Sequence, residues 1–303
     1  MSYHPYPQAG QHGMTPGAAG PGSAGYFDWP RRHPWEIGLL VLVIVSSFVL
    51  YLVAIVVVAT HEVSVVWLSI LGAPLVLYLL RGFTYGKQRV NGVKMSPTQF
   101  PEGHRLVAEA ARKFGLTEVP DGYVVLGNGV INAFSSGHGF RRYVVVNSDL
   151  FEIGGRARDP EALAFVIGHE VGHIAAGHAS YWRQLSQLAM QLPFLGPSLS
   201  RSMEYTADNY GYAFCPHGAR NAIGVLSAGK YLLRSVDFDG MANRATSEDG
   251  FFVWLVNMMS SHPVNTWRAA ALRNRWVAGS VFFRPQQQVY PAEHAVHPAS
   301  RLY

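Results

Sequence analysis

The chain has 303 residues, enough for one domain of ordinary size plus appendages. Charged residues make up 14% of it, below the about one quarter of an average soluble domain, while the apolar fraction is ordinary. This combination indicates that part of the chain lies in lipid. The net charge of +5 is spread along the sequence and forms no basic cluster, which argues against a nucleic-acid partner.

The first 80 residues divide into a polar part and two apolar runs. Residues 1–35 are rich in Gly and Pro and show no periodicity, so we expect a disordered tail. Residues 37–60 are almost unbroken apolar sequence, long enough to cross a hydrocarbon core of about 30 Å as a helix. A second run, 65–80, is at the low end of spanning length. We expect a transmembrane helical hairpin over residues 36–82; the alternative is one span followed by an interfacial or core helix.

Basic residues near the ends of the two runs predict the orientation of the hairpin. Arg31 and Arg32 precede the first run, whereas Arg81, Lys87 and Arg89 follow the second. The turn between the runs has no Lys or Arg. The positive-inside rule therefore places both ends, and all that follows, on the cytoplasmic side of the cell (inner) membrane, in a multi-pass protein.

The rest of the chain predicts a mainly helical α+β domain. A helix is expected over 101–114, because Pro101 suits a first helical position, Gly115 a stop, and Leu106, Val107, Ala110 and Phe114 share one face. Asp159 is the expected N-cap of a helix over 160–179. Three strands are expected at 122–126, 130–134 and 143–147, with 135–140 as a hairpin loop, and further helices at 200–214, 219–235, 251–260 and 264–276. Residues 284–303 are expected to form a polar tail.

The segment His169-Glu170-Val171-Gly172-His173 carries the first chemical signal. Two histidines four residues apart lie one turn apart on one face of a helix, where both rings can reach one metal ion. Glu170 beside them can hold a metal-activated water. This is the H-E-x-x-H signature of zinc hydrolases.

A catalytic zinc site usually needs a third protein ligand. His178 lies one residue short of the metzincin spacing, so we expect it to line the site or cap the helix end rather than bind metal. Glu204 on a separate helix is the better candidate. Asp208, one turn further on, can accept the ring N–H of a ligand histidine. Taken alone, this Glu/Asp pair is more often a solvated helix face.

Four segments together resemble the M48 family of metallopeptidases, which includes the membrane protease HtpX and the CAAX prenyl protease. They are the H-E-V-G-H helix, the E-Y-T-A-D segment from Glu204 to Asp208, the N-A-F segment Asn132-Ala133-Phe134 before a strand, and His262-Pro263 before Arg268. The resemblance covers about residues 97–275. It implies a gluzincin-like zinc peptidase domain, which we place at 83–283, and one zinc ion per chain.

The resemblance also implies a role for each matched residue. His169, His173 and Glu204 would bind zinc, Glu170 would be the general base, and Asp208 would orient a ligand. The strand with Asn132, Ala133 and Phe134 would pair with an extended substrate. His262 and Arg268 are candidates for oxyanion or substrate contacts, with structural pairing as the alternative for either.

The sequence thus predicts a membrane-anchored zinc endopeptidase that cleaves polypeptides, with membrane or misfolded proteins as its expected substrates. Residues 181–199 contain Arg183, several Gln and two prolines, so no later span of the HtpX type is expected. The CAAX prenyl protease is built from many spans, which this sequence does not resemble, so a CAAX substrate is not expected either. Two alternatives stay open. One is a membrane-tethered zinc-binding scaffold or partner-binding protein without peptidase activity, and the other is a membrane protein that binds no metal.

Overall fold

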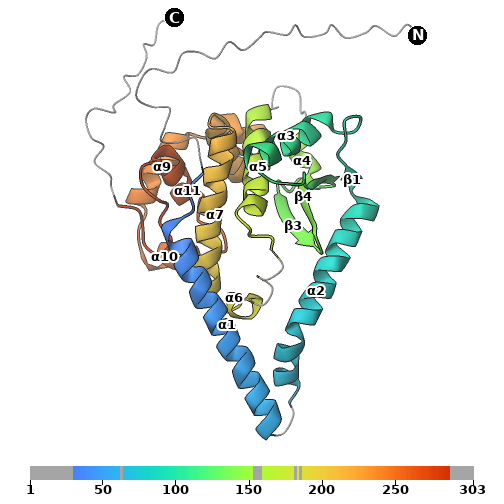
Figure 1. Cartoon of the computed structure of the whole chain (residues 1–303). Helices are drawn as coiled ribbons and strands as arrows, with labels where there is room; N and C mark the ends of the chain where they lie inside the picture. The colour runs from blue at the N-terminus through green and yellow to red at the C-terminus, as the bar shows by residue number, and fades with distance from the viewer. Residues whose placement is uncertain (1–29, 62–63, 153–158, 181–182, 184–185, 287–303) are drawn as a thin grey trace, which may run out of the picture.

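A computed structural model describes residues 30–286, except 62–63, 153–158, 181–182 and 184–185. It has the predicted α+β class, with many helices and one small sheet (Figure 1). Most of the predicted N-terminal tail and all but the first residues of the predicted C-terminal tail lie outside the described residues.

The elements follow one another along the chain as helices that surround four strands. The helices are α1 (Pro34–Thr60), α2 (Val65–Asn91), α3 (Pro101–Lys113), α4 (Ser148–Phe151), α5 (Pro160–Ala175), α6 (Gln187–Met190), α7 (Leu195–Phe214), α8 (Gly218–Leu232), α9 (Phe238–Ser247), α10 (Phe251–Met259) and α11 (Asn265–Arg273), with a 3-10 turn at Leu233–Ser235. The strands are β1 (Val93–Lys94), β2 (Asp121–Val125), β3 (Ala133–His138) and β4 (Arg141–Asn147).

Helices α1 and α2 correspond to the two apolar runs. The end of α1 and the start of α2 lie close together, and the two helices diverge towards the rest of the protein, so that they form a V (Figure 1). Both are long and apolar enough to cross a membrane. Only 17% of the most apolar 18-residue stretch of α1, and none of that of α2, is buried within the protein. α2 is longer than its apolar run and continues to Asn91.

The sheet has the order β1-β2-β4-β3, with β2 parallel to β4 and β3 antiparallel to β4. The predicted strand at 130–134 and loop at 135–140 are wrong, because the strand occupies Ala133–His138 and the turn is Gly139-Phe140. Ser and Gly have weak strand propensity, but pairing with the buried β4 overrides it. Gly139 has φ +58°, which permits the tight turn.

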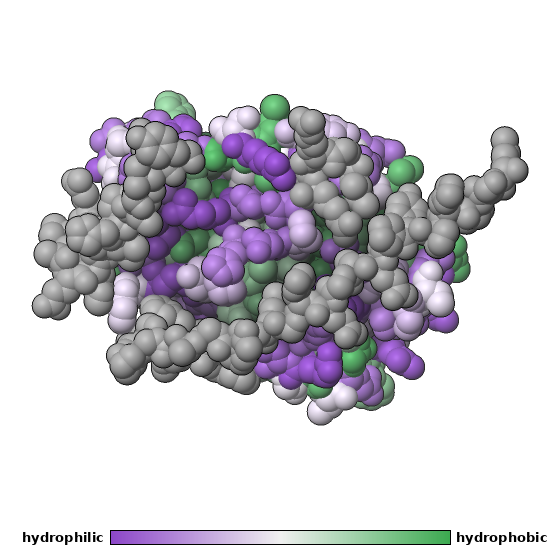
Figure 2. Space-filling view, turned by 90° about the horizontal axis from the view of Figure 1, so that it is seen from above, coloured by the Kyte–Doolittle hydropathy of each residue, from purple (hydrophilic) through white to green (hydrophobic). Residues whose placement is uncertain are grey.

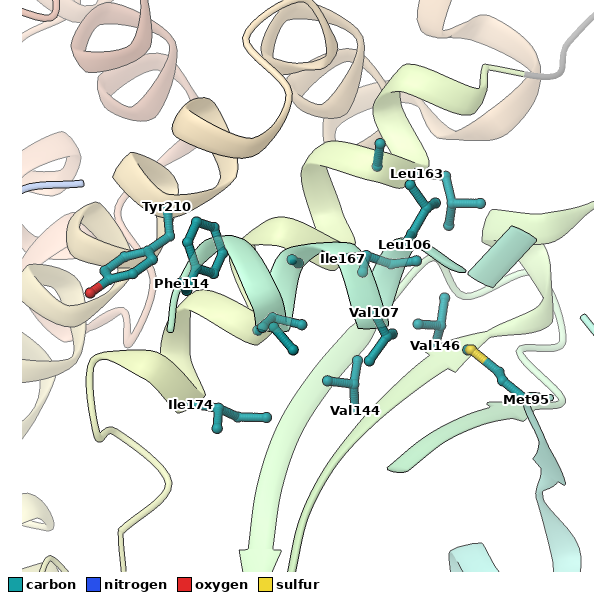
Figure 3. Close-up of a cluster of buried hydrophobic side chains, with 14 of the residues drawn as sticks. Met95, Leu106, Val107, Phe114, Val144, Val146, Leu163, Ile167, Ile174 and Tyr210 are labelled. Atoms are coloured by element: carbon teal, nitrogen blue, oxygen red, sulfur yellow. The ribbon is translucent and has the colours of Figure 1, made fainter. Parts of the chain in front are cut away.

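Helices α3 and α5 cover one face of the sheet and form the main core (Figure 3). The predicted apolar face of α3 is buried as expected, and the helix ends before Gly115, which has φ +70°. The core combines side chains from α3 (Leu106, Val107, Ala110), the sheet (Val124, Val144, Val146) and α5 (Leu163, Ile167, Ile174). α5 is thereby fixed against the sheet.

The other predicted helices are present with shifted ends. Asp159 caps α5 as predicted, since its Oδ1 accepts a hydrogen bond from the Ala162 N–H at 2.8 Å. α5 ends at Ala175 rather than residue 179, because Gly177 has φ +79° and turns the chain away. α7 begins five residues before its predicted start, and α9, which was not predicted, is capped by the Asp237 side chain.

Helices α5 and α7 approach one another at glycines. A Cβ atom added to Gly172 would lie 2.3 Å from the Cβ of Tyr210, and one added to Gly168 would lie 2.7 Å from the Cβ of Phe214. Neither contact is sterically allowed. Because glycine has no side chain, Gly168 and Gly172 let α5 and α7 approach this closely.

Replacing Gly172 with Ala should destabilise the protein. The added methyl group must push α7 away, and overpacking of this kind costs about 1–3 kcal/mol. Gly86→Ala is the control, because a Cβ atom at Gly86 meets nothing within 4 Å. Thermal unfolding in detergent should show a lower midpoint for Gly172→Ala alone. Equal midpoints for the two variants would show that these glycines do not set the helix separation.

Candidate metal centre

Three donor side chains converge where α5 faces α7. His169 and His173 lie one turn apart on α5, and their Nε2 atoms are 3.2 Å from each other. On α7, Glu204 places Oε2 3.4 Å from the His169 Nε2 and Oε1 3.3 Å from the His173 Nε2. All three donor atoms lie within 4.8 Å of one another, so one metal ion can contact all of them.

The chemistry of this cluster fits a zinc ion. Two imidazoles and one carboxylate are a donor set of catalytic zinc sites that leaves one coordination position open. Glu204 is only 8% exposed, and a buried carboxylate needs a cationic partner. Burial alone would raise the pKa of Glu204, but His173 and His169 hold it well below its usual value. The site is thus electrostatically suited to a cation.

Asp208 and Arg268 fix the His169 ring on the side that faces away from the donor cluster. The His169 Nδ1 lies 3.0 Å from the Asp208 Oδ1, and Arg268 donates to both carboxylate oxygens of Asp208, at 3.0 and 2.6 Å. Burial opposes ionisation of Asp208, but Arg268 and His169 outweigh it and lower its pKa to about 2. The carboxylate is therefore ionised and accepts the Nδ1 proton, which leaves the Nε2 of His169 free to face a metal ion in the donor cluster.

His173 contacts a histidine instead of a carboxylate. Its Nδ1 lies 2.7 Å from the Nδ1 of His178, whose Nε2 lies 3.1 Å from the Oε1 of Glu36 on α1. His178 therefore lines the centre and stands outside the group of donors. Burial is the main cause that lowers its pKa to about 4, so it is neutral and does not act as a cationic cap.

Sequence reasoning missed Glu36. The signal was an acidic residue in the first turn of an otherwise apolar helix, where it is also an ordinary partner of the helix dipole. The sequence did not show which residue Glu36 contacts, because its partner His178 lies 142 residues further along the chain.

Glu170 lies beside the donor cluster on α5 and is 7% exposed. Within the part of the chain that the structure describes, its carboxylate forms no hydrogen bond or ion pair. A buried carboxylate without a protein partner, next to a metal site, can accept a proton from a bound water.

The remaining predicted site residues surround this centre in different ways. Arg268 is buried and its guanidinium is engaged by Asp208, which favours structural pairing over an oxyanion contact. The His262 side chain is 65% exposed, with its Nε2 3.5 Å from the Oε1 of Glu204, so it can approach a ligand at the open side. Ala133 and Phe134 begin β3, the edge strand that packs beside α5, and Asn132 directly precedes them.

The site has two histidines and a carboxylate that converge beside Glu170, for which the described residues provide no partner. This arrangement is typical of metal-dependent hydrolases. The family model of "Peptidase family M48" matches residues 97–195 and 181–276, which is more than half of the chain. The protein therefore belongs to peptidase family M48 and is a metallopeptidase. No curated protein sequence matches the chain significantly.

Zinc binding should tighten as the pH rises. Burial opposes protonation of His169, but its hydrogen bonds to Asp208 and Glu204 raise its pKa to about 10 in the metal-free protein. Zinc must displace this proton, so we expect a gain in affinity of about tenfold per pH unit between roughly pH 6.5 and 9. By the same linkage, this proton stabilises the metal-free fold fully below about pH 6.5, and the contribution is lost as the pH rises towards 10.

Competition with a chelator, corrected for the protonation of the chelator itself, measures this dependence. An affinity that is constant across the window, or that falls with rising pH, would show that no proton leaves His169 when zinc binds.

Proposed function

We propose that the protein is a membrane-anchored zinc endopeptidase that cleaves membrane or misfolded proteins, with Glu170 as the general base. The observation that carries this proposal is the convergence of His169, His173 and Glu204 next to the unpaired carboxylate of Glu170. A structural zinc site is closed by four protein ligands and has no use for such a base.

Each residue has a definite task in this reaction. A zinc ion on the three donors would supply a Lewis acid that activates a water and polarises the scissile carbonyl. Glu170 takes the proton of the attacking water and passes it to the leaving amine. Asp208 and Arg268 keep His169 in the tautomer that presents Nε2 to the metal.

The edge strand β3 supports an extended polypeptide as substrate. Among the described strands, β3 pairs with β4 alone, and Ala133 at its start packs against clusters that contain side chains of α5, the helix of His169 and His173. An extended chain can add to such an edge through backbone hydrogen bonds, whatever its side chains. This mode of binding suits cleavage within a polypeptide, hence an endopeptidase.

Helices α1 and α2 support anchoring in a lipid bilayer. Their large apolar side chains are mostly exposed, which is unfavourable in water and favourable in lipid. The opposite end of the molecule is mainly hydrophilic where its surface is visible (Figure 2). Arg31 and Arg32 directly precede α1, and Arg81, Lys87 and Arg89 lie in the second half of α2, so the basic residues are on the side away from the connecting turn. We therefore propose that the peptidase domain faces the cytoplasm.

We accordingly divide the chain into a tail (1–35), a transmembrane hairpin (36–82), a peptidase domain (83–283) and a polar tail (284–303). α1 is more than an anchor in this division, because its first turns are buried against the domain. Leu39, Leu40 and Val43 pack with Leu199 of α7 and with Val281. These contacts support the proposal that α1 stays packed on the peptidase domain in the active enzyme.

Replacing Glu170 with Gln should abolish proteolysis and leave zinc binding intact, because Glu170 is not a ligand. We expect a loss of at least about 100-fold in the rate of cleavage of an unfolded protein such as casein. Glu161→Gln is the matched control, since Glu161 is an exposed carboxylate in the first turn of the same helix. It should keep both zinc and activity.

Chelator-treated wild type completes the comparison and should lose the same activity. Full proteolysis by the Glu170→Gln protein would remove Glu170 from its role. A wild type that binds zinc but cleaves no unfolded protein under any condition would favour a zinc-binding scaffold.

A further inference from the structure

We propose that Glu36, at the start of the first apolar helix, is a positioning residue of the metal centre that acts on the ligand His173 through His178. The inference rests on the proposed zinc site and extends it into α1. It gives the helix a part in metal binding in addition to anchoring.

An unbroken line of contacts joins Glu36 to the centre. The Glu36 Oε1 lies 3.1 Å from the Nε2 of His178, and the Nδ1 of His178 lies 2.7 Å from the Nδ1 of His173. The other ring nitrogen of His173 faces Glu204 at 3.3 Å, inside the donor cluster. Glu36 is 0% exposed, so water does not compete for these contacts.

The positions of the protons follow from the chemistry of the two rings. The Nε2 of His173 must be unprotonated to bind a metal, so its proton is on Nδ1 and is donated to the Nδ1 of His178. That nitrogen must then be an acceptor, which places the proton of His178 on its Nε2. This N–H is donated to Glu36, which has to be an ionised acceptor. Only one arrangement of protons satisfies the whole line.

Without the Glu36 carboxylate, the opposite arrangement becomes available. His178 can then carry its proton on Nδ1 and donate it to the Nδ1 of His173. The proton of His173 would move to Nε2, the atom that must bind the metal. The Glu36 carboxylate therefore selects the tautomers that leave the ligand nitrogen open.

Glu36 is itself held in place from three directions. Arg32 donates to its Oε1 at 2.6 Å, Thr206 of α7 donates to its Oε2, and the Nη2 of Arg183 lies 3.6 Å from its Oε1. Arg32 also donates to the carbonyl of Ala176 at the end of α5, at 2.6 Å. The carboxylate is thus fixed relative to both helices that carry the ligands.

The two ligand histidines are supported by the same principle. Each has a buried carboxylate behind its Nδ1, directly in the case of Asp208 and through one intervening imidazole in the case of Glu36. Each carboxylate in turn contacts an arginine. An ordinary buried ion pair would need the arginines but would not need His178 between the carboxylate and a metal ligand.

Zinc affinity of the full-length protein in detergent, measured by competition with a chelator, tests this proposal. Glu36→Gln keeps the size of the side chain and removes the charge, and we expect it to weaken zinc binding about 10–100-fold, the usual effect of losing such a partner. Ser47→Ala is the control. Ser47 is equally buried on α1, but it bonds to Ser186 and Ala189, away from the metal centre.

A double-mutant cycle distinguishes positioning from a general structural effect. If Glu36 acts through His178, then Glu36→Gln should add no further loss of zinc affinity to a His178→Ala protein. The visible absorption bands of the Co²⁺-substituted protein should change in Glu36→Gln and stay unchanged in Ser47→Ala. Thermal unfolding of the metal-free variants verifies that each one is folded.

Two results would overturn the proposal while the proposed function stands. One is a wild type that binds zinc and a folded Glu36→Gln protein that binds it equally tightly. The other is fully additive losses in the double variant. A wild type that binds no zinc would overturn the proposed function and this inference together.

Discussion

The close approach of α5 to α7 is the constraint on which the whole site depends. The H-E-x-x-H segment supplies two histidines and a glutamate but only two metal ligands, and the third must come from a distant part of the chain. Gly168 and Gly172 let α7 approach α5, which brings Glu204 and Asp208 to opposite sides of His169. The glycine within the motif thus has a packing role, and the sheet and α3 fix α5 from its other side.

Buried charge is the second organising feature, and it links the apolar helix α1 to the rest of the peptidase. Glu204, Asp208 and Glu36 are all buried acids, which fold at a cost unless cations or hydrogen bonds compensate. Asp208 has Arg268, and Glu36 has Arg32 together with the hydroxyl of Thr206. Glu204 faces histidines alone. Glu204 is also the carboxylate of the cluster in which, within the described part of the chain, one divalent cation can be held.

Much of the site could be read from the sequence, because its signals are local. The shared face of His169 and His173 follows from helical geometry alone. Asp159 as an N-cap and Gly115 as a stop indicate helix ends from local chemistry. The link between Glu204 and α5 was less direct. It came from the need for a third ligand and from the family resemblance, since no periodicity shows which surfaces of two helices meet.

What the sequence could not show was non-local. β3 contains Ser and Gly and becomes a strand only by pairing with β4. Glu36 becomes part of the metal centre only because α1 packs on α7 and brings its carboxylate to His178. The apolar run that follows Glu36 favoured a membrane anchor and gave no reason to expect a second task. Tertiary contact decided both cases.

X-ray absorption spectroscopy at the zinc edge of the purified protein tests the central claim most directly. We expect one zinc per chain with two imidazole nitrogens and a carboxylate oxygen at about 2.0–2.2 Å, and a loss of the metal when Glu204 is replaced by Ala. Protein without bound zinc would contradict this claim. So would a centre with a third imidazole in place of the carboxylate, because His178 or His262 would then be the third ligand instead of Glu204.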